Sequence, residues 1–178
     1  MKRKAVVWIS TVLYVLISFA IIGLLLAALR PKIAETRDSF LIDQTIQSLN
    51  TMDDSILIVK NEAQGAVRTY RIRLDKGDLT IDGINEKIFW QAISNAPGGE
   101  SNVEVPVIEG VMTELTIPYG NLWNVTLKMD YSNRNMNITV NGKDDKKTLT
   151  PASLEYKIFI SNKGMQAGGK QQIDFSIS

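Results

Sequence analysis

The 178-residue chain contains no cysteine and no histidine. Without cysteine it has no disulfide bonds, and without either residue it has no metal site built on Cys or His ligands. Catalysis by a Ser-His or Cys-His pair is excluded for the same reason. The chain also lacks a glycine-rich phosphate loop, a nucleophile elbow and an acid-base signature. The sequence therefore predicts no enzyme activity and no bound cofactor or metal.

Negative charge is missing from the first part of the chain. Residues 1–32 carry five Lys or Arg side chains and no acid, and the remaining residues carry 15 basic and 19 acidic side chains, a net charge of −4. Nucleic-acid binding needs a clustered basic face, so this mildly acidic remainder predicts no nucleic-acid partner. A short basic run at 68–73 and a charged run at 143–147 are interpreted as solvated, charge-blunted edges.

Charge of either sign is absent from Ala5 to Leu29, a run of 25 residues. As a helix this run is about 37 Å long, enough to cross a hydrocarbon core of roughly 30 Å with some tilt. Three fates are open to it: a cleaved secretory signal, a permanent anchor, or a helix held in the membrane and later buried among identical helices. A secretory signal has a shorter apolar region and an A-x-A-like cleavage site, which this run lacks.

Polar and small residues lie on two sides of the predicted apolar helix. At about 100° per residue, one group faces roughly opposite to the other. Hydroxyl groups can hydrogen-bond to a neighbouring helix, and small residues let backbones approach closely. We therefore expect this helix to pack against other helices through two sets of residues: Ser10, Thr11, Tyr14 and Ser18, and Ala20, Gly23 and Ala27.

Pro31 follows the apolar run and predicts a bend, because proline lacks the N–H of a regular helix. From residue 32 to 61 there is no Pro or Gly, and apolar residues recur every three or four positions, as on one face of a helix. This predicts an amphipathic stem that ends near residue 63, with Gly65 as its stop, and packs on the downstream domain. A fresh start at Asp53 and a strand over Ile56–Val59 are the alternatives. The stripe comprises Ile42, Ile46, Leu49, Met52, Ile56 and Val59.

From Val67 onward the apolar residues alternate with polar ones, the period of a strand. We expect a hairpin between 67–74 and 79–81, and further strands over 86–93, 103–108, 112–117, 122–131, 135–140, 154–160 and 171–177. Asn162–Gly164 is expected to form a turn. The predicted fold class is α+β, a long N-terminal helix followed by an antiparallel β-sandwich-like domain. The predicted divisions are a basic leader 1–4, an apolar helix 5–31, a stem 32–65 and a β domain 66–178.

Two N-x-[ST] sequons begin at Asn124 and Asn137. Alternation along the strand directs every second residue to the core, namely Trp123, Val125, Leu127, Met129 and Tyr131. It directs Asn124 and Thr126 outward. The same alternation predicts that Asn137 and Thr139 are exposed. Exposed sequons are candidate N-glycosylation sites of an exported domain. Lys2, Arg3, Lys4 and the terminal amine precede the apolar helix, against Arg30, Lys32 and Arg37 after it, a small excess that, together with the sequons, favours a cytoplasmic N-terminus with the β domain outside.

These features resemble the archaeal type IV pilin-like proteins with a class III signal peptide. The resemblance rests on the leader Met1-Lys2-Arg3-Lys4, the uncharged helix, its amphipathic continuation and the β-rich exterior with sequons. It implies cleavage by a prepilin peptidase after Lys4 or after Ala5. It also implies partners: membrane lipid, copies of this chain or related pilins, and a pilus assembly machinery. The Gly often found before the cut is absent here, as is the acid common at the fifth mature position.

The sequence thus favours a structural or adhesive subunit at the cell surface, single-pass in the cell membrane and able to enter an extracellular filament. A different class of function shares every feature except assembly: a permanently anchored, extracytoplasmic binding module. The state of the N-terminus in native protein separates these two hypotheses.

Overall fold

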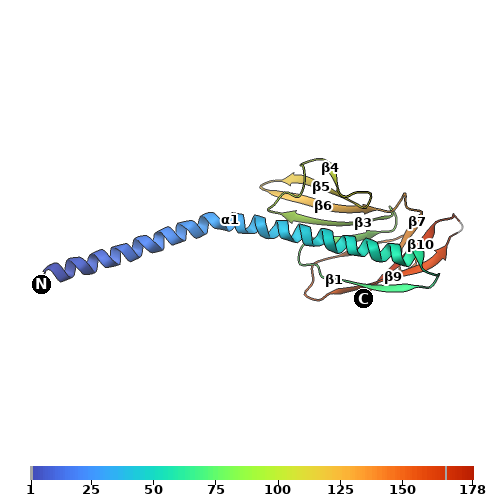
Figure 1. Ribbon diagram of the computed structural model, residues 1–178, viewed down its shortest axis with the longest axis horizontal. Coiled ribbons are helices and arrows are strands. Elements are labelled where there is room, and N and C mark those ends of the chain that lie inside the picture. Colours follow the sequence, from blue (N-terminus) through green and yellow to red (C-terminus); the bar gives the residue numbers. More distant parts are fainter. Residues whose placement is uncertain (1, 167) are drawn as a thin grey trace.

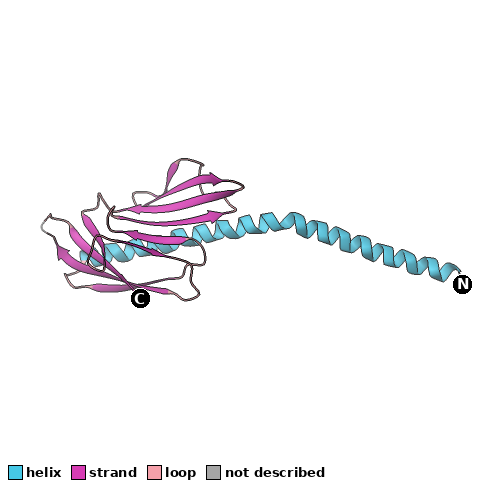
Figure 2. Ribbon diagram, turned by 180° about the vertical axis from the view of Figure 1, so that it is seen from behind, coloured by secondary structure: helices cyan, strands magenta, loops and turns pink. Residues whose placement is uncertain are grey.

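The computed structural model describes residues 2–166 and 168–178, with side chains described from residue 11 onward. Helix α1 (Lys2–Asn61) comes first, and ten strands in two sheets follow it. Figure 1 shows the second half of α1 lying between the two sheets and its first half extending well beyond them. The view from behind in Figure 2 shows the same projection. The α+β architecture predicted from the sequence is confirmed.

The first sheet has four strands in the order β1-β9-β10-β7, and the second has six in the order β4-β5-β6-β3-β2-β8. Every neighbouring pair is antiparallel except β10 and β7, which run parallel. The strand bounds are β1 (Val67–Ile72), β2 (Asp78–Asp82), β3 (Lys87–Ser94), β4 (Glu104–Ile108), β5 (Met112–Tyr119), β6 (Leu122–Asp130), β7 (Met136–Val140), β8 (Lys146–Leu149), β9 (Tyr156–Met165) and β10 (Gln171–Ile177).

The apolar stripe of the stem packs into the space between the sheets, as the sequence predicts. Leu49, Met52, Ile56 and Val59 are fully buried, and Ile46 packs against the same core. Each side chain of this size contributes about 1.5–3 kcal/mol when it leaves water, so the stripe alone provides strong attachment of the helix. The helix is continuous through Ile56, which excludes the alternative strand there.

The helix ends at Asn61, just before the predicted position, and Gly65 turns the chain toward β1. Gly65 has a φ of +92°, a conformation that glycine adopts without steric cost. Asn162 caps this end of the helix, because its Nδ2 donates to the carbonyl of Val59 in the last turn at 3.0 Å and to that of Glu62, just past the helix, at 2.9 Å. The predicted turn at 162–164 was wrong: these residues belong to the long strand β9.

The predicted hairpin between 67–74 and 79–81 was also wrong. Strand β1 pairs with β9, whereas β2 pairs with β3 and β8 in the other sheet. The turn chemistry at residues 75–78 is real, but it redirects the chain from one sheet to the other. Strand β8 overlaps the charged run at 143–147, where no strand was predicted, and it forms an edge of its sheet. Local alternation identifies strands but does not choose their partners, which explains these errors.

Helix α1 continues through Pro31. Figure 1 shows it changing direction near the point where it leaves the sheets. A proline inside a helix removes one backbone hydrogen bond and crowds the preceding turn, which is sufficient to bend the axis. The bend predicted at Pro31 therefore has a physical cause at the right place in the chain.

Gly77, in the link between the sheets, provides a test of close packing. Its φ is +75°, and a Cβ at this position would lie 2.7 Å from the carbonyl oxygen of Gln91. We expect Gly77→Ala to lower the free energy of unfolding by about 2–4 kcal/mol, through backbone strain of order 1–2 kcal/mol plus the clash. Gly120→Ala is the matched control, because Gly120 has a φ of +61° but open space around its Cβ. Equal losses in urea unfolding of the two variants would show that the clash contributes nothing.

Candidate functional site: a projecting apolar helix

The first half of α1 is apolar and has no partner in the domain. Over the described residues, its most apolar 18-residue window is 0 % buried, and it is long and apolar enough to cross a membrane. Large apolar side chains are exposed around the whole circumference; they include Leu13, Leu16, Phe19, Ile22, Leu24 and Leu26. Exposing such a surface to water costs tens of kcal/mol at roughly 25 cal/mol per Å². The helix therefore requires lipid or protein around it.

The two predicted packing faces lie on this projecting segment. The Ser18 hydroxyl donates to the carbonyl oxygen of Tyr14 at 2.8 Å, so that donor is satisfied inside the helix. The Tyr14 side chain is 70 % exposed. Gly23 has open space on its Cβ side, and Ala20 and Ala27 are exposed. The side chain of Ser10 lies outside the described residues, as do those of Lys4 and Ala5 at the candidate cleavage site.

Apolar exposure continues past the basic cluster that ends the uncharged run. Ile33 and Phe40 are 64 % and 67 % exposed. Phe40 lies ten residues beyond Arg30, which corresponds to about 15 Å along a helix. Lys32 and Glu35 form an exposed ion pair at 2.7 Å on the same part of the helix. The apolar surface of α1 is thus longer than its uncharged segment.

Asp38 joins the helix to the sheets near the end of the domain from which the apolar half of α1 projects. Its Oδ2 lies 2.8 Å from Lys76 Nζ and accepts hydrogen bonds from the backbone and side-chain nitrogens of Asn95, each at 2.7 Å. Burial alone would raise the pKa of this carboxyl group, but the hydrogen bonds from Lys76 and Asn95 outweigh it and lower the pKa below its ordinary value.

The lowered pKa of Asp38 predicts acid sensitivity of this joint. A depressed folded-state pKa gives stability that is present above the ordinary carboxyl pKa of 3.8 and is lost as the pH falls through the folded value. We expect Asp38→Asn to make the loss of unfolding free energy between pH 6 and pH 3 shallower, as measured by urea titrations at both pH values. The neighbouring exposed variant Asp43→Asn is the control. An unchanged pH slope in Asp38→Asn would contradict the assignment.

Asp53 joins the middle of the stem to the far end of the domain. Its Oδ1 accepts hydrogen bonds from the Tyr131 hydroxyl and from Arg134 Nη1, each at 2.8 Å. Burial, followed by the charge of Asp53, raises the pKa of Tyr131 well above its ordinary value. The Arg134 guanidinium also lies 5.1 Å from the centre of the Tyr131 ring. This largely buried triad fixes the helix against the loop that follows β6.

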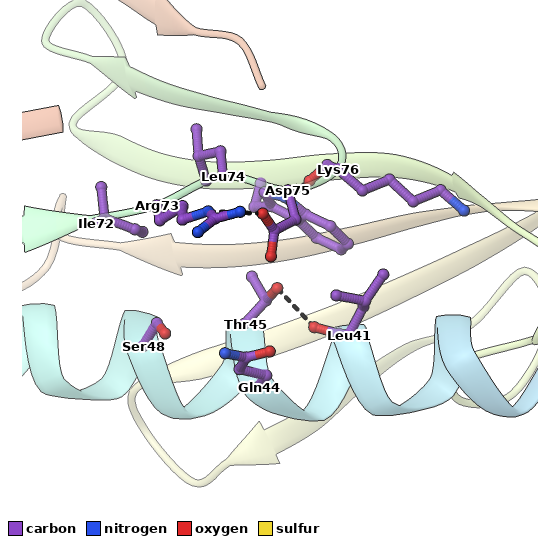
Figure 3. A pocket seen from close by; sticks show the side chains of 10 residues that line it. Leu41, Gln44, Thr45, Ser48, Ile72, Arg73, Leu74, Asp75 and Lys76 are labelled. Atoms are coloured by element: carbon purple, nitrogen blue, oxygen red, sulfur yellow. Dashed lines mark hydrogen bonds and ion pairs between the residues drawn. The ribbon is translucent and has the colours of Figure 1, made fainter. Parts of the chain in front are cut away.

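Tyr70 of β1 adds a third polar attachment, and it joins the helix to the four-stranded sheet. Its hydroxyl donates to the carbonyl oxygen of Ser48 at 2.6 Å, and burial raises its pKa to about 12. A cavity of about 40 Å³ lies beside this contact, lined by Gln44 and Thr45 of α1 and by residues 72–76 (Figure 3). Figure 3 shows Arg73 directed toward Asp75, with which it forms an ion pair at 2.9 Å. The cavity is of the size of a water site and is too small for an organic ligand.

The two sequons lie on different sheets. Asn124 is half-buried in β6, and its Oδ1 accepts a hydrogen bond from Gln91 Nε2 at 3.0 Å. Asn137 is half-buried in the edge strand β7, and its Nδ2 donates to Gln166 at 3.0 Å. The predicted exposure of Thr139 was wrong, because it is 1 % exposed and its hydroxyl donates to Asp174 at 2.9 Å. Asp174 of the neighbouring strand β10 also accepts from the amide of Gly142 in the turn after β7, and strand alternation could not reveal this shared contact.

Among the described residues no group of three or more Asp or Glu side chains is arranged to hold a metal ion. No family model, no curated protein and no solved structure matches the chain. The site is therefore defined by its own geometry: a long apolar helix that could cross a membrane, joined by buried polar contacts to a two-sheet domain. Sequence reasoning found the helix and its stripe, but it missed the roles of Asp38 and Asn162, for which no local pattern exists.

Proposed function

We propose that this protein is a pilin-like structural subunit of the cell surface. Its apolar helix first anchors it in the membrane and then packs against the same helix of other copies. The observation that carries the proposal is the complete exposure of the apolar half of α1 together with the firm attachment of its other half to the domain. Such a helix cannot fold back to cover itself, so its apolar surface is available only to lipid or to neighbouring molecules.

The apolar surface beyond the basic cluster supports protein neighbours over lipid alone. With Arg30 and Lys32 at the membrane surface, Phe40 lies about 15 Å outside the hydrocarbon core. Lipid tails do not reach that far, whereas a parallel helix of another copy does. Small residues at Ala20, Gly23 and Ala27 give the inner part of such a contact the close approach that helix pairs in membranes use.

N-terminal sequencing of the native protein tests the proposal directly. A mature chain that begins at Ala5 or Val6 would support processing by a prepilin peptidase and retention of the apolar helix. An intact Met1, or a start at Lys2, would instead support a permanently anchored binding module. Electron microscopy of sheared surface material adds a second readout, since filaments with helical symmetry containing this chain are expected only from a polymerising subunit.

N-glycosylation at Asn124 and Asn137 belongs to the same proposal. A domain exported with its N-terminus in the cytoplasm places both sequons outside the cell, where their half-buried side chains lie on the surfaces of two different sheets. Mass spectrometry of the native protein is expected to find a glycan on at least one of these asparagines. Two unmodified asparagines would remove this support for an exterior location.

A further inference from the structure

Two unpaired sheet edges lie on opposite sides of α1. Strand β4 is at one edge of the six-stranded sheet, and strand β1 is at one edge of the four-stranded sheet. Figure 1 shows β4 above the helix and β1 below it. Edge strands present unpaired groups to any neighbouring molecule, so their side chains determine what can approach.

The β4 side is acidic. Residues 88–127 contain four glutamates and no Lys, Arg or Asp. Glu100 and Glu109 flank β4, are exposed, and take part in no ion pair with a described residue. Glu104, on β4 itself, contacts Lys128, the first basic residue after this stretch, and remains 42 % exposed. The edge therefore keeps an unneutralised negative charge.

The β1 side is basic. Arg71 of β1 lies directly opposite Lys157 of β9, and neither side chain forms an ion pair with a described residue. Like charges in directly opposite strand positions destabilise a sheet, so this pair favours an incoming anion. Arg73 has the same strand parity as Arg71 and extends the basic surface, although Asp75 partly neutralises it.

We propose that the acidic β4 edge of one copy contacts the basic β1 edge of the next copy. This inference rests on the proposed function, because it takes a second copy of the chain as the partner. When copies stand side by side with parallel helices, the two edges on either side of α1 face opposite neighbours, so β1 of one meets β4 of another. Such a contact joins two different surfaces and can repeat without closing, which is the requirement for a filament.

The contact is expected to form through side chains. Pro106 lies within β4 and lacks an N–H, which disfavours a continuous hydrogen-bonded ladder with a foreign strand. The remaining edge strand of the six-stranded sheet, β8, carries Lys146 and Lys147. Lys146 Nζ lies 4.0 Å from Asp82 Oδ2, but the run 143–147 keeps a net positive charge, so β8 is a poorer partner for the basic β1 than the acidic β4 is.

Cysteine cross-linking of the full chain in membranes tests the contact, and the absence of native cysteine leaves no background. One chain carries Thr69→Cys in β1, and a second carries Ser101→Cys beside β4. A short bifunctional maleimide is expected to link the two chains to each other. Thr69→Cys alone is expected to give no dimer, and Thr69→Cys mixed with Lys147→Cys is the matched control for chance collision.

Charge variants identify the force. Arg71→Glu in the first chain is expected to lower the yield of the linked dimer about tenfold, and Glu109→Lys in the second chain is expected to restore it. Failure of the charge swap to restore the link would overturn the proposal, as would equal yields with the Lys147→Cys control. Cross-linking through Ala27→Cys in the apolar helix, measured in parallel, distinguishes failure of the edge contact from failure of the proposed function. A link between helices without a link between edges overturns the edge contact only. The absence of both links overturns the proposed function.

Discussion

Deleting residues 2–29 is expected to release the chain from membranes and leave the β domain folded. From residue 11 onward, where side chains are described, the deleted segment contains the exposed apolar side chains from Val12 to Leu29 and none of the buried core residues. The segment costs tens of kcal/mol to expose to water, at roughly 25 cal/mol per Å², so the chain without it no longer needs a membrane. Because the deletion removes only surface residues of the described structure, the free energy of unfolding of the domain should change by less than about 1 kcal/mol.

Fractionation of cells that express the two forms provides the measurement. The full chain is expected with the membranes or in detergent micelles, and the shortened chain is expected in the aqueous fraction with a cooperative urea transition. A shortened chain that still sediments with membranes would show that the β domain has a membrane contact of its own. A shortened chain that is unfolded would show that the first half of α1 contributes to the core.

Replacing Asp53 by alanine is expected to lower the free energy of unfolding by about 3–5 kcal/mol. Asp53 is 2 % exposed, and its carboxylate is the partner of the Arg134 guanidinium, whose side chain is 18 % exposed. Removing one member of a buried ion pair leaves the other charge without its partner in a poorly hydrated place, which typically costs this amount. The Tyr131 hydroxyl loses its acceptor in the same variant.

Two comparison variants make the Asp53 prediction specific. Asp54→Ala changes the adjacent, exposed carboxylate and is expected to stay within about 0.5 kcal/mol of the native chain. Tyr131→Phe keeps the ion pair and loses only one hydrogen bond, so a loss of about 1–2 kcal/mol is expected. Urea unfolding of the full chain in detergent measures all three. Similar values for Asp53→Ala and Asp54→Ala would contradict a stabilising role for the triad.

The long uncharged run and the stem were predictable because their signals are local. Twenty-five consecutive residues without charge specify a helix that needs an apolar environment, whatever the rest of the chain does. Repeats of three and four residues place Leu49, Met52 and Ile56 on one face, and the structure buries that face completely. Most strands were likewise identified by alternation, which depends only on neighbours in sequence.

Partner choice was decided only by the tertiary structure. Asp38 and Asn95 are 57 residues apart in the sequence, and Asp53 and Arg134 are 81 apart, so no local pattern joins them. The same limit explains why β1 pairs with β9 in place of its expected hairpin partner, and why Thr139 is buried beside Asp174 of β10. The sequence by itself determined the helix, most of the strands and the need of the apolar segment for lipid or neighbours, because periodicity and hydrophobicity act over a few residues. The fold decided which polar groups meet and which edges remain open, because those depend on how distant segments fill one core.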